Sequence, residues 1–406
     1  MDFSLTEEQT LLADSVTRFI DNEYRFEERQ RIAASDEGYS RDMWRNFADL
    51  GWTAVPFPEA DGGLGGGAVE TTLLMEAFGR GLVLEPFLPT VILAGGVLKR
   101  CATPAQKERW LLPLIGGELQ AALAFAEPQG RFDPLDIVTT ATADGNHFVI
   151  NGRKALVPNG RAADLLVIPA RTEGGAHDGT PIDRIGGTRD RARDGTPIDR
   201  IGGTRDGTPI ALFAVAADAA GVQRRGYRTV DGHNAAEIVL DEVQVPAGSV
   251  LGPVGGGAEI LLDVLCDGTL ALCAEAFGIL RALQEKTVEY TKNRVQFSVP
   301  VASFQALQHR MVDMFIGREQ IRSLLTWSVM LAAAGAPETR RAVSALKYQI
   351  GTTGRLIAQE AVQLHGGMGM SWELDIAHYF KRFSAIEILF GNADYHLDRF
   401  RQLVSA

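Results

Sequence analysis

The spacing of hydrophobic residues changes twice along the chain, and these changes divide it into three regions. In the first hundred residues, apolar side chains recur on one face of a helix, at Leu12, Val16, Phe19 and Ile20. Thr6 and Gln9 have the spacing of a capping box, which predicts that this helix begins just after Thr6. From about residue 121 the apolar runs become short and β-branched, and after Gly257 the helical period returns. The pattern predicts a helical region, a β region and a second helical region.

The strands expected in the middle region lie between turn residues. Asp144-Gly145 and Asn151-Gly152 flank the first of them, so both dipeptides are interpreted as turns. The expected strands are His147 to Ile150, Leu165 to Ile168, Ile210 to Val215 and Glu237 to Val245. Their spacing predicts a β domain with hairpin connections.

An apolar stripe in the C-terminal region combines methionine and aromatic residues. Its members are Phe304, Leu307, Met311, Met314 and Phe315. Because they recur at helical spacing, we expect them to lie in the core of a helical bundle. The predicted domains are residues 1–118 (helical), 119–250 (β) and 251–406 (a helical bundle).

A run of glycines, Gly62 to Gly67 with Leu64 among them, interrupts the first helical region. No Lys-Ser or Lys-Thr pair follows it, which excludes a phosphate-binding P-loop. We therefore expect a flexible connector at this position.

A repeat interrupts the β region. Asp178 to Asp190 reads DGTPIDRIGGTRD, and Asp194 to Asp206 repeats this sequence letter for letter. Its glycine, proline, threonine and balanced charge bury too little apolar surface to offset the entropy of ordering. Residues 174–206 are predicted to form a disordered insertion between two strands.

Composition and charge narrow the classes of partner. The chain has 406 residues, 46% of them hydrophobic, and 40 basic against 51 acidic residues give a net charge of -11. Such a surface repels nucleic acid and anionic membranes, so neither is expected as a partner. No apolar run reaches the length of a membrane span, three cysteines form no CxxC pair, and Met1-Asp2-Phe3 opens no signal peptide. The expected location is the cytoplasm.

The sequence lacks the motifs of serine hydrolases and of metal sites. His365-Gly366-Gly367 has a likeness to an esterase oxyanion loop, but the sequence has no Gly-x-Ser-x-Gly. The seven histidines form no HExxH motif or Cys/His cluster, so no metal site is predicted. We expect His365, His378 and His396 to be polar residues of a core or an interface.

Short motifs along nearly the whole chain resemble those of the acyl-CoA dehydrogenase family. They are Met1 to Gln9, Pro58-Glu59 with Gly62 to Gly65, Glu127-Pro128, Asn151 to Lys154, Arg294 to Phe297 and Gln363 to Gly369. Small subunits similar to pimeloyl-CoA dehydrogenase show the greatest likeness. The resemblance implies an α+β fold with a helical N-terminal domain, a middle β-barrel domain and a C-terminal four-helix bundle. It also implies FAD as the cofactor and an acyl-CoA as the substrate.

The resemblance identifies the positions of the catalytic base. In that family a carboxylate removes the α-proton of the thioester while a hydride moves from the β-carbon to FAD. Relatives carry this glutamate at one of two positions, which are Gly391 and Gly268 here. The usual base is absent, and no catalytic residue is assigned. Four nearby carboxylates stay open as unorthodox bases: Asp267, Glu275, Glu387 and Asp394.

The resemblance also identifies positions that contact the flavin ring. Relatives have Thr-Glu-Pro and Trp-x-Thr segments there. In this chain Ala126 replaces the first threonine, Phe132 replaces a serine, and Leu156 and Pro158 replace the tryptophan and threonine. Leucine has no aromatic face and proline has no backbone N–H, so the ring site is expected to be lost.

The half of the FAD site that holds ADP looks retained. In the family, a neighbouring subunit holds this portion with an Arg-x-x-Phe pair and a Gln-x-x-Gly-Gly loop. The matching residues here are Arg294, Phe297, Gln363, Gly366 and Gly367, with Ser298 in place of a usual glycine. An arginine fork suits a pyrophosphate, and glycines permit close backbone approach. The alternative is that Arg294 is a solvated helix-end residue and the two glycines terminate a helix.

Three hypotheses follow from these patterns. In the first, the chain is the non-catalytic small subunit of a heteromeric acyl-CoA dehydrogenase, a heterotetramer with a larger paralogue that passes electrons to a separate acceptor. In the second, it is a self-sufficient homo-oligomeric acyl-CoA dehydrogenase with an unorthodox base. In the third, it is a non-redox scaffold that binds acyl-CoA. The ring site is expected to be lost while the ADP site is retained, and this asymmetry favours the first hypothesis.

Overall fold

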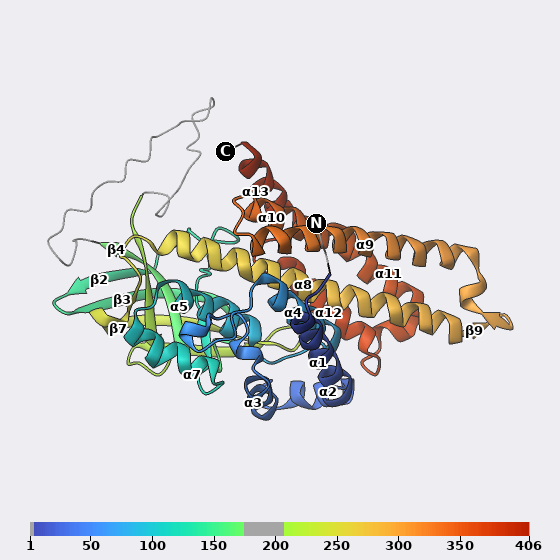
Figure 1. Cartoon of the computed structure of the whole chain (residues 1–406), viewed down its shortest axis with the longest axis horizontal. Coiled ribbons are helices and arrows are strands. Elements are labelled where there is room, and N and C mark those ends of the chain that lie inside the picture. The colour runs from blue at the N-terminus through green and yellow to red at the C-terminus, as the bar shows by residue number, and fades with distance from the viewer. Residues whose placement is uncertain (1–3, 174–206, 406) are drawn as a thin grey trace.

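The structure, a computed structural model, describes residues 4–173 and 207–405 of the chain. Helices surround a sheet at one end of the molecule, one long helix runs from that sheet to the opposite end, and a second long helix returns beside it (Figure 1). The insertion predicted at residues 174–206 lies outside the described residues.

The N-terminal region is helical, as its apolar pattern predicts. Thr6 caps the first helix, and the reciprocal hydrogen bonds between Thr6 and Gln9 form the predicted capping box. Its inward face buries Val16 and Ile20. The α-helices are α1 (Glu7–Glu23), α2 (Phe26–Ala34), α3 (Arg41–Asp49), α4 (Ala68–Gly81), α5 (Gly95–Cys101), α6 (Pro104–Gln106) and α7 (Leu112–Ile115). Short turns of other helix types are η1 (Trp52–Ala54), η2 (Glu59–Asp61), η3 (Leu88–Ala94) and η4 (Lys107–Leu111).

The glycine run between η2 and α4 is a packed turn, so the prediction of a flexible connector was wrong. A β-carbon at Gly63 would lie 2.1 Å from the carbonyl oxygen of Phe57, and one at Gly66 would lie 2.8 Å from Val55. Gly62 has a φ of 83°, which favours glycine. These glycines allow two backbone segments to approach closely.

The middle region forms one eight-stranded sheet in the order β6-β7-β3-β2-β4-β5-β8, with β1 beside β4. The β1–β4 and β2–β4 pairs are parallel and the others are antiparallel. All four expected strands are present. The strands are β1 (Ala121–Leu123), β2 (Thr140–Asp144), β3 (His147–Pro158), β4 (Leu165–Glu173), β5 (Ile210–Ala216), β6 (Val222–Arg228), β7 (Asn234–Pro246) and β8 (Val250–Leu251), with the turn η5 (Ala247–Ser249) before the last.

One predicted turn is instead part of a strand. Asn151-Gly152 lies within β3, which continues to Pro158 and shifts register against β7 between Ile150 and Gly152. A β-carbon at Gly152 would lie 2.3 Å from the Thr139 hydroxyl oxygen. This glycine accommodates a close neighbour at a strand irregularity, whereas Asp144-Gly145 forms the predicted hairpin turn.

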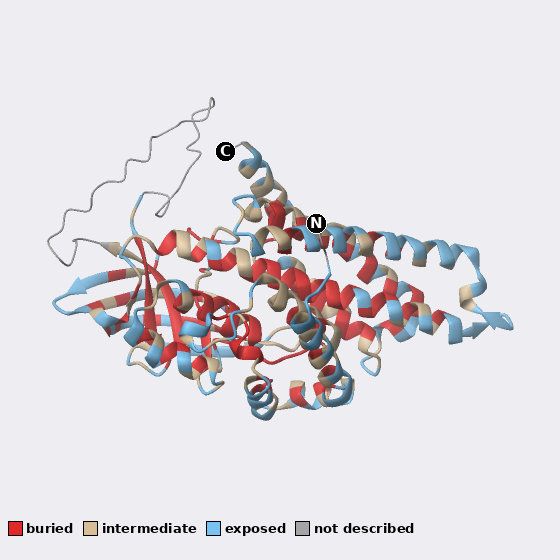
Figure 2. Ribbon diagram, in the orientation of Figure 1, coloured by how far each residue is buried: buried red, intermediate tan, exposed pale blue. Residues whose placement is uncertain are grey.

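The C-terminal region is a group of packed helices dominated by α8 (Gly257–Asn293) and α9 (Gln305–Ala333). Buried residues occupy much of α8, which packs against α4, α9 and α11 (Figure 2). The hairpin between α8 and α9 consists of β9 (Val295–Gln296) and β10 (Val299–Pro300), followed by the turn η6 (Val301–Ser303). The remaining elements are α10 (Thr339–Gln349), η7 (Ile350–Gly354), α11 (Arg355–His365), η8 (Gly366–Met370), α12 (Asp375–Ile388) and α13 (Ala393–Ser405).

The methionine and aromatic stripe of α9 does not lie wholly in the core. Met314 is buried, but Phe315 is 47% exposed and Phe304, at the start of the helix, is 38% exposed. Val312 and Ile316 beside them are also exposed. The apolar spacing continues onto a second face of α9 that is partly exposed, and periodicity alone does not distinguish this face from the buried one.

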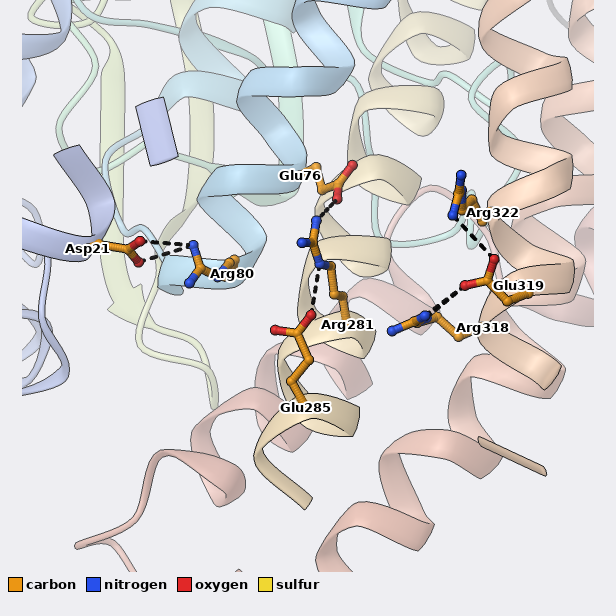
Figure 3. A network of polar contacts seen from close by, with 8 residues as sticks. All are labelled: Asp21, Glu76, Arg80, Arg281, Glu285, Arg318, Glu319 and Arg322. Atoms are coloured by element: carbon orange, nitrogen blue, oxygen red, sulfur yellow. Dashed lines mark hydrogen bonds and ion pairs between the residues drawn. The ribbon is translucent and has the colours of Figure 1, made fainter. Parts of the chain in front are cut away.

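Ion pairs connect the N-terminal helices to the long helix α8 (Figure 3). Arg80 on α4 contacts Asp21 on α1 at 3.0 Å. Arg281 on α8 contacts Glu76 on α4 at 3.2 Å and Glu285 on its own helix at 3.0 Å. Partly exposed pairs such as these contribute about 0 to 1 kcal/mol each, so packing holds these helices together. Within the described ranges, no helix has the length and apolarity that crossing a membrane requires.

Candidate cofactor and substrate sites

A cavity of about 270 Å³ lies where the three regions meet. The N-terminal region contributes Phe78 and Phe87, the β region contributes Leu156 and Pro158, and the C-terminal region contributes Phe390. Two of the predicted ring-contact positions, Leu156 and Pro158, therefore line an apolar chamber, which we call the junction cavity, whereas Ala126 and Phe132 do not line it.

Three charged side chains form a buried network in its wall. The Arg382 guanidinium donates to both carboxylate oxygens of Glu275, at 2.5 and 2.8 Å, and to Asp231 at 2.8 Å. Burial, together with the charge of Arg382, lowers the pKa of His233 to about 3, so its imidazole is neutral at pH 7. Because a buried charge needs a partner, Arg382 and the two carboxylates depend on one another.

The four carboxylates considered as unorthodox bases are dispersed. Of these, Glu275 lines the junction cavity, and both of its oxygens are bound by Arg382. Asp267 pairs with Arg100 at 2.5 Å, Glu387 pairs with Arg355 at 3.1 Å, and Asp394 is exposed. None of the four combines access to the cavity with a free carboxylate oxygen.

Both usual base positions are filled by neighbouring side chains. A β-carbon at Gly391 would lie 2.3 Å from the Tyr395 ring, and φ of 111° at Gly391 disfavours any other residue. A β-carbon at Gly268 would lie 2.4 Å from a methyl group of Leu93. A side chain at either position would therefore require Tyr395 or Leu93 to move.

The residues at the ring positions do not fit an isoalloxazine. The Leu156 N–H is bound by the Glu237 carboxylate at 3.3 Å, and Pro158 has no N–H to donate. The Phe132 ring lies against Tyr395 with centroids 5.8 Å apart. The hydroxyl groups and the aromatic face that serve the ring in relatives are all missing.

Two residues of the family motifs form a buried structural pair. Lys154 Nζ lies 2.6 Å from Glu127 Oε1, and both side chains are fully buried. Lys154 also donates to the Pro169 carbonyl at 2.7 Å, and the Thr139 hydroxyl donates to Glu127 at 2.7 Å. Burial lowers the pKa of Lys154 to about 8, despite the carboxylate beside it. This pair joins the segment before β2 to strands β3 and β4.

A second site lies at the far end of α8. Arg294, Gln363, Gly366 and Gly367 line one open groove of about 500 Å³, which we call the terminal groove. A β-carbon at Gly366 or Gly367 would meet nothing within 4 Å, and Gly366 has a φ of 61°. The structure brings these four predicted residues together around a space that glycine leaves open.

The fifth predicted residue, Phe297, stands apart from this groove. It lies at the tip of the β9–β10 hairpin, is 85% exposed, and contacts the edge of Phe304 with ring centroids 6.1 Å apart. Phe297 and Ser298 both have positive φ, 52° and 66°. An exposed aromatic ring on a short hairpin is suited to contact another chain.

The charge of Arg294 is available in the terminal groove. Arg294 is exposed, and no carboxylate among the described residues forms an ion pair with its guanidinium. The other arginine of the groove, Arg310, is paired with Glu360. The Arg294 fork therefore fits a phosphate-bearing group.

The three C-terminal histidines are buried polar residues, as predicted. His365 stacks on Tyr290 with centroids 4.3 Å apart, His378 packs on Phe26, and His396 lies beside Tyr395. Burial lowers the pKa of His396 to about 3. Across the described parts of the chain, no group of histidine, cysteine or carboxylate side chains has the arrangement of a metal site.

Sequence reasoning missed two buried carboxyls in the junction cavity, Asp231 and Glu85. Glu85 is 4% exposed and lines the cavity, and burial raises its pKa to about 7. The sequence signal was a lone acidic residue within the apolar run Leu82 to Leu88. An isolated carboxylate in such a run predicts burial of a titratable group.

Comparison with protein families matches three successive profiles. Residues 6–118 match "Acyl-CoA dehydrogenase, N-terminal domain", residues 122–182 match the middle domain, and residues 255–403 match the C-terminal domain. A similar curated protein is acryloyl-CoA reductase (NADH) of Anaerotignum propionicum, 28% identical over 98% of this chain and 94% of its own length. Acyl-CoA dehydrogenase FadE27 of Mycobacterium tuberculosis is 26% identical over 98% of this chain and 97% of its own length.

Solved structures share the fold over the whole chain. Butyryl-CoA dehydrogenase of Megasphaera elsdenii has a TM-score of 0.85 and 25% identity, with complete coverage of both chains. A chain of the ChsE4-ChsE5 complex of Mycobacterium tuberculosis has a TM-score of 0.84 at 24% identity, and the match covers 100% of this chain and 99% of that chain. These matches confirm the predicted fold class and the predicted family, and the family supports FAD as the cofactor. The closer likeness to pimeloyl-CoA-dehydrogenase-like small subunits stays a prediction.

Proposed function

The chain belongs to the acyl-CoA dehydrogenase family, and from this premise we propose that it is the non-catalytic small subunit of a heteromeric acyl-CoA dehydrogenase. In this proposal it holds the ADP portion of an FAD whose ring and base belong to a larger paralogue. The assembly is a cytoplasmic heterotetramer that oxidises an acyl-CoA and passes electrons to a separate acceptor.

The observation that carries this proposal is the contrast between the two half-sites. Tyr395 and Leu93 occupy the space in which side chains at Gly391 and Gly268 would begin, and in the junction cavity Leu156 and Pro158 offer no ring contact. At the terminal groove, Arg294 and the two glycines leave an open, positively charged space. A chain that keeps the ADP half-site and lacks the ring half-site suits a subunit that completes its neighbour's cofactor site.

The terminal groove supplies the chemistry that an ADP portion requires. Arg294 is suited to donate two parallel hydrogen bonds to a pyrophosphate, and Gly366 and Gly367 permit its close approach. Gln363 adds an amide that both donates and accepts hydrogen bonds. FAD, when bound, supplies the hydride acceptor of the reaction. This chain's residues only hold and orient its distal end.

The exposed apolar face of α9 supports the presence of a partner. Val312, Phe315, Ile316 and Trp327 are each at least 40% exposed, and Phe297 adds an exposed ring at the adjoining hairpin. Apolar surface of this kind marks protein interfaces. The ChsE4-ChsE5 structure, a complex of two different chains, has the same fold.

The proposal is tested by co-expressing this chain, tagged, with an untagged larger paralogue and measuring what co-purifies. We expect a complex with fewer FAD molecules than chains, in which acyl-CoA bleaches the flavin, while this chain alone is colourless. A yellow isolated chain that an acyl-CoA bleaches would support the self-sufficient enzyme instead. Acyl-CoA binding in a complex without flavin would support the scaffold.

A further inference from the structure

A histidine in the terminal groove has one ring nitrogen without a partner. His365 ends α11, lines the groove and is 5% exposed. Its Nδ1 lies 2.8 Å from the carbonyl oxygen of Ala361, one turn earlier on the same helix. Nε2 has no hydrogen-bond partner among the described residues, and unlike Nδ1 of His396 it is not sealed from solvent. This largely buried side chain therefore keeps one polar atom accessible where it lines the groove.

Two contacts fix the orientation of the His365 ring. The Tyr290 ring of α8 stacks on it, with centroids 4.3 Å apart and an angle of 27° between the planes. The Tyr290 hydroxyl also donates to the His365 carbonyl at 3.3 Å, so one residue holds both the ring and the backbone. Because the face of the ring and Nδ1 are both held, Nε2 has a defined direction. A group that is fixed in this way loses little conformational entropy when a ligand binds.

The hydrogen bond to Ala361 determines what Nε2 can bind. A carbonyl only accepts hydrogen bonds, so Nδ1 carries the ring proton. Burial lowers the pKa of the His365 imidazole, although the bond to Ala361 and the carboxylate of Asp375 oppose this shift, so the ring is neutral at pH 7. Nε2 is therefore an acceptor without a proton. It can accept a hydrogen bond from a hydroxyl group or an amine, but it cannot bind a phosphate oxygen.

The terminal groove thus presents two unpaired groups of different character. Arg294 supplies a cation that no described carboxylate neutralises, and His365 supplies a neutral acceptor. None of the described residues that line the groove is an aspartate or a glutamate. A fatty acid would satisfy only Arg294, and a neutral alcohol would satisfy only His365. A ligand that satisfies both has a phosphate group and, close to it, a hydrogen-bond donor.

We propose that His365 is a specificity-determining residue of the terminal groove, and that its Nε2 accepts a hydrogen bond from a ribose hydroxyl of the bound nucleotide. His365 directly precedes Gly366, where the open backbone permits a diphosphate to approach. In an ADP portion the group joined to the diphosphate is the ribose, and the adenine amine lies one group further away. The inference rests on the proposed function, because it concerns the same groove, and it adds the selection of a ribonucleotide.

The first test uses the wild-type full chain and needs no mutation. Calorimetric titration with ADP, 2′-deoxy-ADP and 3′-deoxy-ADP removes one ribose hydroxyl at a time, and inosine diphosphate removes the adenine amine. We expect at least one deoxy nucleotide to bind about tenfold more weakly than ADP, because one hydrogen bond is lost, and inosine diphosphate to bind as tightly as ADP. Equal affinities for ADP and both deoxy nucleotides would overturn the proposal. A loss confined to inosine diphosphate, or no binding of ADP at millimolar concentration, would overturn it as well.

Two variants separate Nε2 from the rest of the ring. His365→Asn places an amide near the position of Nδ1, so it keeps a donor for Ala361 and loses the acceptor. His365→Gln extends an amide oxygen toward the position of Nε2. We expect His365→Asn to bind ADP and its deoxy forms equally, and His365→Gln to keep part of the preference for ADP. His147→Asn, at an exposed histidine of β3 outside the groove, is the matched control. An undiminished preference for ADP in His365→Asn would contradict the assignment.

The FAD content of the complex with the larger paralogue separates this inference from the proposed function. His365→Asn should weaken FAD binding about tenfold, since one hydrogen bond is lost, and Arg294→Ala should weaken it further. If FAD content depends on Arg294 but ADP and its deoxy forms bind equally, only the role of His365 is overturned. If FAD content does not depend on Arg294 but His365→Asn abolishes a preference for ADP, only the contribution to the partner's cofactor site is overturned.

Discussion

The ring of Tyr395 occupies the space in which a side chain at Gly391 would begin. A β-carbon built at Gly391 lies 2.3 Å from Cδ1 of Tyr395 and 3.0 Å from Nε2 of His396. The Gly391 carbonyl also accepts a hydrogen bond from Lys347 at 2.8 Å, which fixes the backbone there. The missing glutamate is therefore a change in packing as well as in chemistry.

Gly391→Glu should leave the isolated chain inactive and should lower its free energy of unfolding by about 1 to 3 kcal/mol, through steric overlap and positive φ. Denaturant unfolding and acyl-CoA-dependent flavin bleaching measure the two effects. Gly391→Glu with Tyr395→Ala relieves the overlap and serves as the control. This double variant should recover at most part of the stability, because the positive φ at Gly391 remains. It should show no activity, because Leu156 and Pro158 still offer no contact to a flavin ring. Bleaching by either variant without a partner would refute this interpretation.

Arg294→Ala should weaken FAD binding to the complex on the order of a hundredfold, because it removes a two-pronged, charge-assisted contact. Arg294→Lys should have an intermediate effect, since an ammonium keeps the charge and loses the planar fork. Flavin absorbance per complex, with and without excess FAD, gives the measurement. Arg45→Ala, at an exposed arginine of α3, is the matched control. Full flavin occupancy in Arg294→Ala would contradict the proposed role of Arg294 and would favour the scaffold hypothesis.

The sequence contained enough to predict the three-region fold and the residues of the terminal groove. Period changes predicted the helix that starts after Thr6 and strands such as β5, because amphipathic spacing follows directly from burial on one side. It did not predict the close packing at Gly63 or the exposed position of Phe315, because both depend on which distant segment lies opposite. Glu85 was missed for the same reason, since only the fold places it in the junction cavity.

Glu85 should make stability depend on pH. Burial raises its pKa from 4.5 to about 7, so the folded chain binds this proton more tightly than the unfolded chain does. The resulting stabilisation is fully present below about pH 4.5 and is lost as the pH rises through 7. Relative to Glu85→Gln, the wild type should therefore lose on the order of 3 kcal/mol between pH 4.5 and 8. Urea unfolding of both proteins across this range measures it. A difference that stays constant with pH would show that Glu85 titrates normally.

Lys154→Met should destabilise the chain by about 3 to 5 kcal/mol, because it leaves the buried Glu127 carboxylate without its cation. Lys154→Met with Glu127→Leu should recover part of this loss, since it removes both charges. Denaturant midpoints of the three proteins give the comparison. The recovery should be incomplete, because Glu127 also accepts hydrogen bonds from Thr139 and the Val138 N–H. A double variant less stable than Lys154→Met would contradict the pairing argument.

Deletion of residues 174–206 should leave the fold intact, because the two ends of the deleted segment join neighbouring strands. β4 and β5 are antiparallel, with Arg171 opposite Ile210, and the Thr172 N–H donates to the Pro209 carbonyl at 3.0 Å. Joining Glu173 directly to Gly207 then leaves a three-residue loop that contains a glycine, a common hairpin connection. We expect cooperative melting within a few degrees of the wild type and normal assembly with the larger paralogue.

Removal of residues 174–208 is the control for this deletion. It leaves Glu173 alone between Thr172 and Pro209, which is too short to close the hairpin without breaking the pairing of β4 with β5. That variant should melt at a clearly lower temperature, whereas the shorter deletion should not. If the 174–206 deletion also lost cooperative melting or failed to assemble, the repeat would be part of the folded structure, and its interpretation as an insertion would be wrong.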